Sequence, residues 1–255
     1  MQTILMTSTL DCYYKDENGV RIPKNFGNKN EILDSIKNNL KKQENFVFVA
    51  SSPEDYEKTD MYSSVIFKSF AMTLPFENYF VLDNRTKSQA KEKLQSADLI
   101  FLCGGHVPTQ NKFFKDINLK QILNGLDTLI IGASAGSMNM ADIVYAEPEE
   151  DGESIDPNYK TYLNGLGLTK LSVLPHFLER LDFVLDGKNI LNEISIPNSK
   201  NRPFIAFSDG DYVMQKDGKL TMFGKSYLFK NNQYNLLTTG GKTDITKVVN
   251  SMYNV

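Results

Sequence analysis

The stretch that decides the fold is DTLIIGASAGSMNMA, residues 127–141. An apolar, β-branched run leads into the small residues Gly132-Ala133-Ser134-Ala135-Gly136, and the remainder can form a helix. A strand, a sharp turn and a helix in this order are typical of a nucleophile elbow. Its glycines avoid collisions with neighbouring backbone, and its serine is held in a strained turn with an exposed hydroxyl. The stretch therefore predicts Ser134 as a nucleophile, with the Ala135 N–H as an oxyanion donor.

The same turn has two other interpretations. It can pack a helix tightly against a strand, or its amides can hold a phosphate or another anion. A non-catalytic, regulatory protein that binds a small ligand or anion on the same fold is therefore the alternative to an enzyme.

Outward from this stretch, short β-branched or aromatic runs alternate with longer amphipathic segments. This alternation predicts an α/β fold with a mostly parallel, doubly wound sheet flanked by helices. Helices are expected over residues 31–42, from Ser52-Pro53 and from Thr86. The expected strands of this part are residues 3–7, 45–50, 79–82, 99–102 and 128–131.

The carboxyl-terminal part shows a different pattern. After two further apolar runs at residues 171–174 and 203–207, short runs are separated by the turn signals Asp217-Gly218-Lys219 and Gly224-Lys225. We expect an antiparallel β meander there, at 212–214, 220–223 and 226–229. The length allows either one large α/β domain or two small ones, and we favour a single domain over residues 1–255.

Composition narrows the function classes. The 255 residues are 41% apolar and 23% charged, as in ordinary globular proteins. A net charge of −3 offers no basic surface for nucleic acid, and no apolar run approaches the roughly 20 residues that span a membrane. Two cysteines and an amino terminus without signal-peptide features favour a reducing, cytoplasmic location. No cofactor is expected, and the protein is expected to be a monomer or a homodimer.

A second glycine turn follows the strand at residues 99–102. Because parallel strands open at the same sheet edge, Gly104-Gly105 can bring a second N–H, that of Gly105, to the oxyanion. The neighbouring Cys103 is an alternative nucleophile, as in relatives of such folds that use cysteine. It precedes the glycine pair instead of occupying the elbow, which disfavours this interpretation.

The chain has only two histidines, so the choice of a general base is narrow. His176 directly follows the apolar run at 171–174, and His106 follows the glycine pair; we favour His176. Asp209 follows the next apolar run and is the candidate that orients the histidine, with Asp211 as its rival. Judged alone, each histidine is more often structural than catalytic, and Asp209 more often caps its own turn; the catalytic interpretation rests on their combination.

Taken together, these motifs resemble the peptidase E family, peptidase family S51, which includes cyanophycinases. This family lies within the class I glutamine amidotransferase-like superfamily. The resemblance rests on four motifs in order, which are Gly104-Gly105, residues 132–136, Pro175-His176-Phe177 and Ser208-Asp209-Gly210. It implies a serine peptidase of small peptides with Ser134 as nucleophile, His176 as base and Asp209 as acid. Peptidase E itself removes amino-terminal aspartate from dipeptides.

The resemblance also implies a further acidic residue between the serine and the histidine, in a loop that ends in Asp-Pro. Asp151, six residues before Pro157, occupies that position. This chain has Ala133 and His106 where relatives often have Trp and Asn, which indicates a different pocket.

The group that would recognise a substrate aspartate is not evident from the sequence; Arg180 and Arg202 are candidates because they lie near the motifs. The acidic segment at residues 147–153 is interpreted as an exposed loop and not as a metal site, because its spacing does not match an EF-hand.

Overall fold

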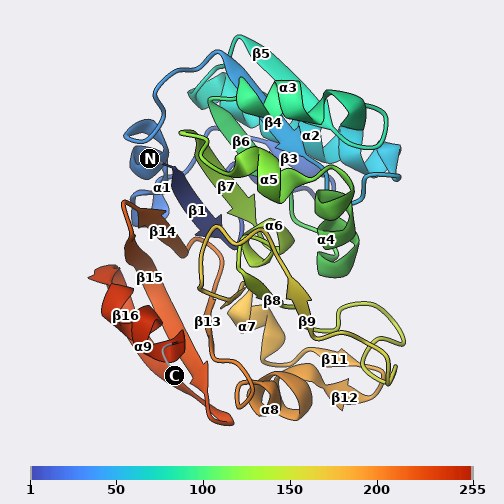
Figure 1. Cartoon of the computed structure of the whole chain (residues 1–255), viewed down its shortest axis with the longest axis vertical. Coiled ribbons are helices and arrows are strands. Elements are labelled where there is room, and N and C mark those ends of the chain that lie inside the picture. The colour runs from blue at the N-terminus through green and yellow to red at the C-terminus, as the bar shows by residue number, and fades with distance from the viewer. Residues whose placement is uncertain (1, 254–255) are drawn as a thin grey trace.

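Five parallel strands form one half of the central sheet in the computed structural model, which describes residues 2–253 (Figure 1). Their spatial order is β1-β7-β6-β4-β5. The prediction of a mostly parallel sheet is confirmed, and β1 and β6 have the predicted bounds. The strands are β1 (Thr3–Thr7), β4 (Asn45–Val49), β5 (Asn78–Leu82), β6 (Leu99–Leu102) and β7 (Leu129–Ala133).

Helices cover both faces of this half, because alternate side chains of each strand point to opposite faces. Leu5 of β1 belongs to the apolar cluster under α1 (Ile32–Lys37) and α2 (Tyr56–Thr73). Ile4 and Met6 belong to the cluster on the other face. The helices of that second face are α3 (Ala90–Gln95), α4 (Val107–Asp116) and α5 (Leu119–Leu123). The sheet is therefore doubly wound, as predicted.

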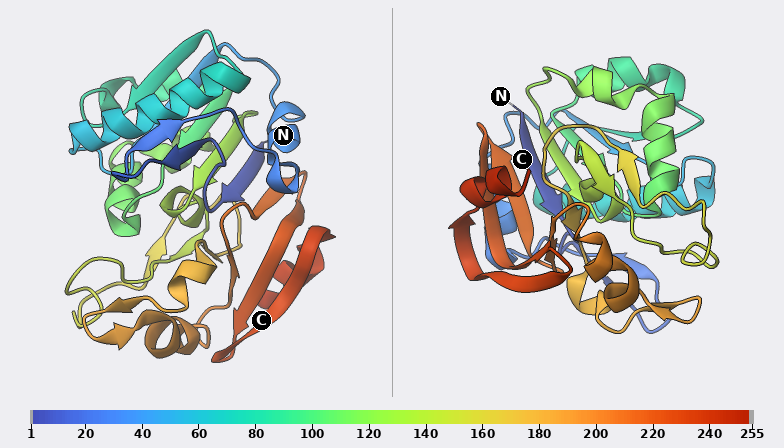
Figure 2. Two further views of the ribbon diagram at one scale, coloured as in Figure 1. Left: turned by 180° about the vertical axis from the view of Figure 1, so that it is seen from behind. Right: turned by 60° about the horizontal axis from the view of Figure 1, so that its bottom comes forward.

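The carboxyl-terminal strands extend the sheet beyond β1. β14 (Tyr212–Lys216) pairs antiparallel with β1 and forms a hairpin with β15 (Lys219–Lys230). The other edge of β15 pairs with β16 (Gln233–Asp244), and Figure 2 shows this ribbon along one side of the molecule.

The predicted turn at Gly224-Lys225 is wrong, because β15 runs through it as one strand. Gly224 has φ +107, and the pairing register with β16 shifts beside it, between Phe223 and Lys225. The glycine marks a β-bulge, which also uses a positive φ. The antiparallel character of this region is nevertheless as predicted.

Strands from the two parts of the sheet point toward one another. β13 (Phe204–Phe207) and β14 follow one another along the same edge of β15, and both run antiparallel to β1. β10 (Val173–Leu174) runs parallel to β13. The carboxyl ends of β10 and β13 therefore meet the carboxyl ends of β1, β6 and β7 near the middle of the molecule.

Shorter elements complete the structure. A hairpin of β2 (Tyr13–Lys15) and β3 (Arg21–Pro23) follows β1 and lies beside α2 (Figure 2). The remaining strands are β8 (Ile143–Tyr145), β9 (Tyr162–Asn164), β11 (Val184–Leu185) and β12 (Lys188–Asn189). The remaining helices and single turns are α6 (Ala135–Met138), α7 (Phe177–Arg180), α8 (Ile196–Asn198), α9 (Thr246–Tyr253), η1 (Lys29–Glu31), η2 (Lys87–Gln89) and η3 (Leu191–Ser195).

Two helix starts differ from the sequence prediction. Asn30 directly precedes the helix predicted over residues 31–42 and is the cap expected from that pattern, but it has φ 53 and its side chain donates hydrogen bonds to Gly210 O and Asp211 Oδ1. α2 begins only at Tyr56, because the side chain of Asp55 accepts the N–H of Lys58 and caps the helix there. The long-range hydrogen bonds of Asn30 and the cap formed by Asp55 thus set the two helix starts, in place of the local sequence pattern.

The close approach of α6 to β6 generates the first prediction. A Cβ on Gly136 would lie 2.1 Å from the carbonyl oxygen of Leu102, which is backbone and cannot move aside. Gly136→Ala should therefore lower the free energy of unfolding by about 3 kcal/mol, measured by urea denaturation. Gly19→Ala is the control, since it meets no atom within 4 Å and adds only the strain of its positive φ, about 1 kcal/mol. Equal losses in the two variants would contradict the steric explanation.

Candidate active site

Ser134 occupies a strained turn between β7 and α6. Its backbone has φ 51 and ψ −116, a conformation that residues other than glycine rarely adopt. The turn is held on both sides, because the Ser134 N–H donates to Thr7 O at 3.0 Å and its carbonyl accepts the N–H of Ser137 at 2.8 Å. The local sequence explains this geometry, since a Cβ on Gly132 would lie 2.6 Å from the backbone nitrogen of Ser137.

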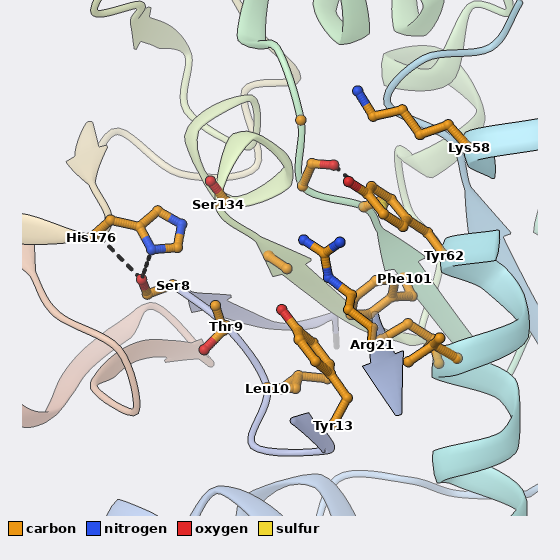
Figure 3. Close-up of a pocket in the computed structure, with 16 residues that line it drawn as sticks. Ser8, Thr9, Leu10, Tyr13, Arg21, Lys58, Tyr62, Phe101, Ser134 and His176 are labelled. Atoms are coloured by element: carbon orange, nitrogen blue, oxygen red, sulfur yellow. Dashed lines mark hydrogen bonds between the residues drawn. The ribbon is translucent and has the colours of Figure 1, made fainter. Parts of the chain in front are cut away.

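Ser134 lies on the wall of a pocket of about 230 Å³, shown in Figure 3. Gly104 packs directly against the serine, since a Cβ on Gly104 would lie 3.1 Å from Ser134 Cβ. The predicted meeting of the two glycine turns is thus observed, and Gly105 also lines the pocket. Ala135 is the first residue of α6, so its N–H has no acceptor within the helix.

His176 reaches the same pocket from the other part of the sheet. It follows β10 with a left-handed φ of 59 and directly precedes α7 as its N-cap residue. Its Nδ1 lies 2.8 Å from Asp209 Oδ1 and 3.1 Å from Ser8 Oγ. Two partners therefore fix the orientation of the ring.

Ser8 was not predicted from the sequence. It is fully buried directly after β1, donates a hydrogen bond to Asp209 Oδ1 and accepts the backbone N–H of His176 at 3.0 Å. A lone serine carries no motif, so the only available signal was its place after the first strand, at the edge where Ser134 also lies.

The pKa values of the two candidate aspartates are shifted in opposite directions. Burial raises the pKa of Asp209, but hydrogen bonds with His176 and Ser8 outweigh it, and the pKa lies below the ordinary value of 3.8. Asp211 accepts a hydrogen bond from Asn30, and burial raises its pKa. Of the two, only Asp209 contacts His176 within residues 2–253.

No hydrogen bond joins the side chains of Ser134 and His176 in the described residues, although both line the pocket. In Figure 3 the imidazole and the serine hydroxyl lie on neighbouring walls. Such bonds are often long before a substrate binds.

His106 lies outside the pocket lining. Its Nε2 pairs with Glu153 Oε1 at 2.8 Å, and its Nδ1 lies 2.8 Å from Thr109 Oγ1.

Cys103 lines the pocket but is poorly suited to be the nucleophile. Burial raises the pKa of its thiol to about 12, so the reactive thiolate is scarce at neutral pH. This agrees with the preference for serine over cysteine.

The acidic segment at residues 147–153 is only partly an exposed loop, contrary to expectation. Glu147 is completely buried, and its Oε2 lies 3.1 Å from Arg180 Nε. The contact is an ion pair without hydrogen-bond alignment. Burial raises the pKa of Glu147, and Arg180 opposes this shift. Glu149 pairs with the same guanidinium.

Three other residues singled out in the sequence lie apart from Ser134. Arg180 is held by Glu147 and Glu149, and Arg202 Nη2 pairs with Asp142 at 2.7 Å. Neither arginine lines the pocket. Asp151 is exposed, outside the pocket lining, and makes no contact with His176 in the described part of the chain.

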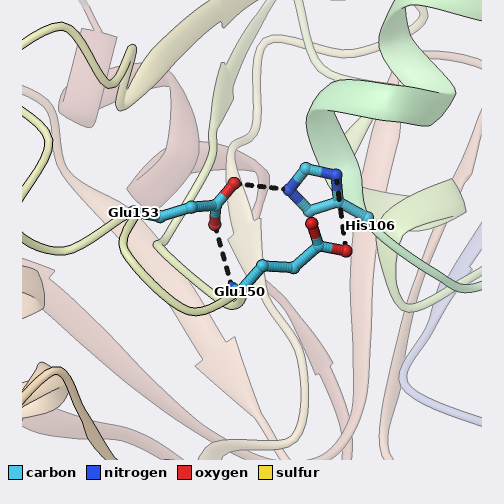
Figure 4. A group of neighbouring side chains, drawn as sticks. All are labelled: His106, Glu150 and Glu153. Atoms are coloured by element: carbon cyan, nitrogen blue, oxygen red, sulfur yellow. Dashed lines mark hydrogen bonds and ion pairs between the residues drawn. The ribbon is translucent and has the colours of Figure 1, made fainter.

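Within residues 2–253, two clusters bring the ligand atoms of a histidine and two acidic side chains within 4.8 Å of one another. One consists of His106, Glu150 and Glu153 (Figure 4). There Glu153 already accepts the backbone N–H groups of Glu149 and Glu150, so internal partners occupy this carboxylate. The other consists of His176, Glu179 and Asp209, where the Asp209 carboxylate orients the imidazole.

Among residues 2–253, no helix combines the length and the apolar character that crossing a bilayer requires.

Comparison with known proteins identifies the class of protein. The chain is an α/β peptidase of the serine type. More particularly, it belongs to peptidase family S51, whose model matches residues 23–223. The fold is similar to a crystal structure of a candidate peptidase E protein from Listeria monocytogenes EGD-e. The TM-score is 0.53 at 14% sequence identity, with 93% of this chain and 100% of that chain covered. No curated protein matches the sequence.

The buried ion pair beside α7 yields the second prediction. Arg180→Met leaves Glu147 buried without a cation and should lower the free energy of unfolding by about 3–5 kcal/mol. Replacing both partners, as Glu147→Leu with Arg180→Met, should restore most of that loss. Lys219→Met removes an exposed pair with Asp244 and should cost less than about 1 kcal/mol. A loss in Arg180→Met no larger than in this control would refute the assignment.

Proposed function

We propose that this peptidase hydrolyses short peptides with Ser134 as its nucleophile, His176 as its general base and Asp209 as the residue that orients the base. One observation supports this most strongly. A serine in a strained turn shares a pocket with a histidine whose Nδ1 is bound to a carboxylate. The strand, turn and helix around Ser134 agree with a nucleophile elbow.

The reaction is acyl transfer in two halves. With Nδ1–H donated to Asp209, His176 Nε2 is unprotonated and takes the proton of Ser134 as its oxygen attacks the peptide carbonyl carbon. The N–H groups of Ala135 and Gly105 stabilise the resulting oxyanion. His176 then protonates the leaving amine as the C–N bond breaks. In the second half, His176 takes a proton from a water whose oxygen attacks the acyl carbon. The bond between that carbon and Ser134 Oγ then breaks, the acid product leaves, and His176 returns the proton to Ser134 Oγ.

Asp209 and Ser8 keep the histidine in the required tautomer. Asp209 carries a negative charge at neutral pH because its pKa is lowered, so it stabilises the imidazolium that forms during the reaction. Asp151 remains a candidate for an additional acid. Its exposed position would require the loop to move for direct participation.

Small substrates fit this site best, because the pocket holds about 230 Å³. The proposal includes dipeptides with an amino-terminal aspartate. We further propose that the protein acts in the cytoplasm, where the free thiols of Cys12 and Cys103 would stay reduced.

The third prediction tests the nucleophile. Ser134→Ala should reduce kcat/KM for a dipeptide library by about 10⁴-fold or more, with an unchanged circular dichroism spectrum. A fluorophosphonate probe should label the natural protein at Ser134, identified by peptide mass spectrometry. Hydrolysis that survives in Ser134→Ala would exclude this mechanism.

The two histidines provide a matched control for the same assay. His176→Ala should lose activity to a similar extent, whereas His106→Ala should retain hydrolysis because His106 lies outside the pocket lining. Loss in His106→Ala alone would assign the base to the other imidazole.

The fourth prediction compares two neighbouring aspartates. Asp209→Asn should lower kcat by about 10⁴-fold, because an amide cannot hold the imidazole in the required tautomer. Asp211→Asn should stay within about tenfold, since Asp211 contacts Asn30 and not His176. Similar losses in both variants would contradict the assignment of Asp209.

The lowered pKa of Asp209 also gives a pH dependence of stability. Its ionised form stabilises the folded state at pH values above its unfolded pKa. That contribution should disappear as the pH falls through the lower folded pKa. Urea denaturation between pH 3 and 7 should therefore show the difference between natural protein and Asp209→Asn shrinking toward low pH.

A further inference from the structure

Arg21 is an arginine that lines the pocket of Ser134. It comes from β3, in the hairpin that the sequence did not predict. Its guanidinium carbon lies 4.5 Å from the ring centre of Tyr62 and 5.4 Å from that of Tyr13. Figure 3 shows the guanidinium pointing into the pocket between these two side chains. The stacking rings hold the cation in place.

The guanidinium of Arg21 has no carboxylate partner within residues 2–253. The other three arginines of the chain each form an ion pair, Arg85 with Asp60 and Asp83, Arg180 with Glu147 and Glu149, and Arg202 with Asp142. Arg21 is thus the exception among the arginines, and it is also the one that lines the pocket of Ser134.

A second cation lines the same pocket. Lys58 of α2 is a lining residue, and its side-chain ammonium forms no ion pair in the described residues. The lining contains no aspartate or glutamate. Two positive charges and no negative charge therefore surround a partly apolar space, which favours an anionic ligand.

The planar shape of the guanidinium favours one kind of anion over others. The guanidinium lies over the rings of Tyr62 and Tyr13, and its N–H groups lie in the plane of the group. A planar, bidentate acceptor such as a carboxylate matches such a fork. A substrate amide would offer one neutral oxygen and would leave the positive charge uncompensated.

We propose that Arg21 is a specificity-determining residue that binds a carboxylate of the peptide substrate, with Lys58 adding to the positive field. This inference rests on the proposed peptidase function of Ser134. A peptide offers that carboxylate either on an acidic side chain or at its carboxyl terminus. Both groups share the same chemistry, and the substrates of the test separate them.

The fifth prediction uses three substrates, Asp-Leu, Asn-Leu and Asp-Leu amide. Asn-Leu replaces the side-chain carboxylate by an amide of the same shape, and Asp-Leu amide removes the terminal carboxylate. The natural protein should prefer Asp-Leu by about 10- to 100-fold in kcat/KM over the analogue that lacks the recognised group. Arg21→Met should reduce this preference to less than about threefold, mainly by raising KM for Asp-Leu.

Two further variants separate recognition from a structural role. Lys15 lies directly opposite Arg21 in the hairpin register, is exposed and does not line the pocket, so Lys15→Met should keep the full preference. Arg21→Lys retains the charge without the planar fork and should show an intermediate preference. Lys58→Met should reduce the preference less than Arg21→Met.

The outcomes distinguish this inference from the proposed function. If Arg21→Met is labelled at Ser134 by the fluorophosphonate probe and keeps the natural preference, the role of Arg21 is wrong and the nucleophile stands. A natural protein that hydrolyses all three peptides equally also overturns it. If Ser134→Ala still hydrolyses peptides, the proposed function itself fails. Loss of the preference in Arg21→Met, but not in Lys15→Met, supports the assignment.

Discussion

The backbone contact between α6 and β6 is the constraint on which the rest of the site depends. Gly136 lies so close to the Leu102 carbonyl that no side chain fits between them. This contact lets the chain turn sharply at Ser134 and places Gly104 against the serine. A wider separation would relax the turn and move the serine away from the glycine pair. Close helix–sheet packing and the exposure of the hydroxyl thus have the same origin.

Around this contact, the mixed direction of the sheet brings distant parts of the chain together. A purely parallel sheet would present all its strand ends at one edge. Here β10 and β13 approach that edge from the opposite direction, so His176 and Asp209 face the end of β1. The buried hydroxyl of Ser8 joins the two parts, since it contacts both the histidine and the aspartate.

The strands and the serine turn were predictable because both leave strong local patterns. β-Branched runs mark the buried strands, and glycines at fixed spacing mark the turn. The continuity of β15 was not predictable, because a glycine bulge and a hairpin turn look alike locally. Ser8 and Arg21 were missed for a different reason. Ser8 matters because of its long-range partners, and Arg21 because it has no carboxylate partner in the described residues. A sequence pattern encodes neither property. Arg180 was named as a candidate for substrate recognition, but its ion pairs with Glu147 and Glu149, which the sequence pattern does not encode, hold it outside the pocket lining.

The acidic segment at residues 147–153 has a mechanical consequence. At one end Glu147 and Glu149 form ion pairs with Arg180, which lies on α7, the helix directly after His176. At the other end Glu153 contacts the imidazole of His106, the residue that follows Gly105. The segment therefore connects the helix that follows His176 with the residue that follows the glycine pair. Loss of either set of charged contacts would leave the segment attached to only one side of the site.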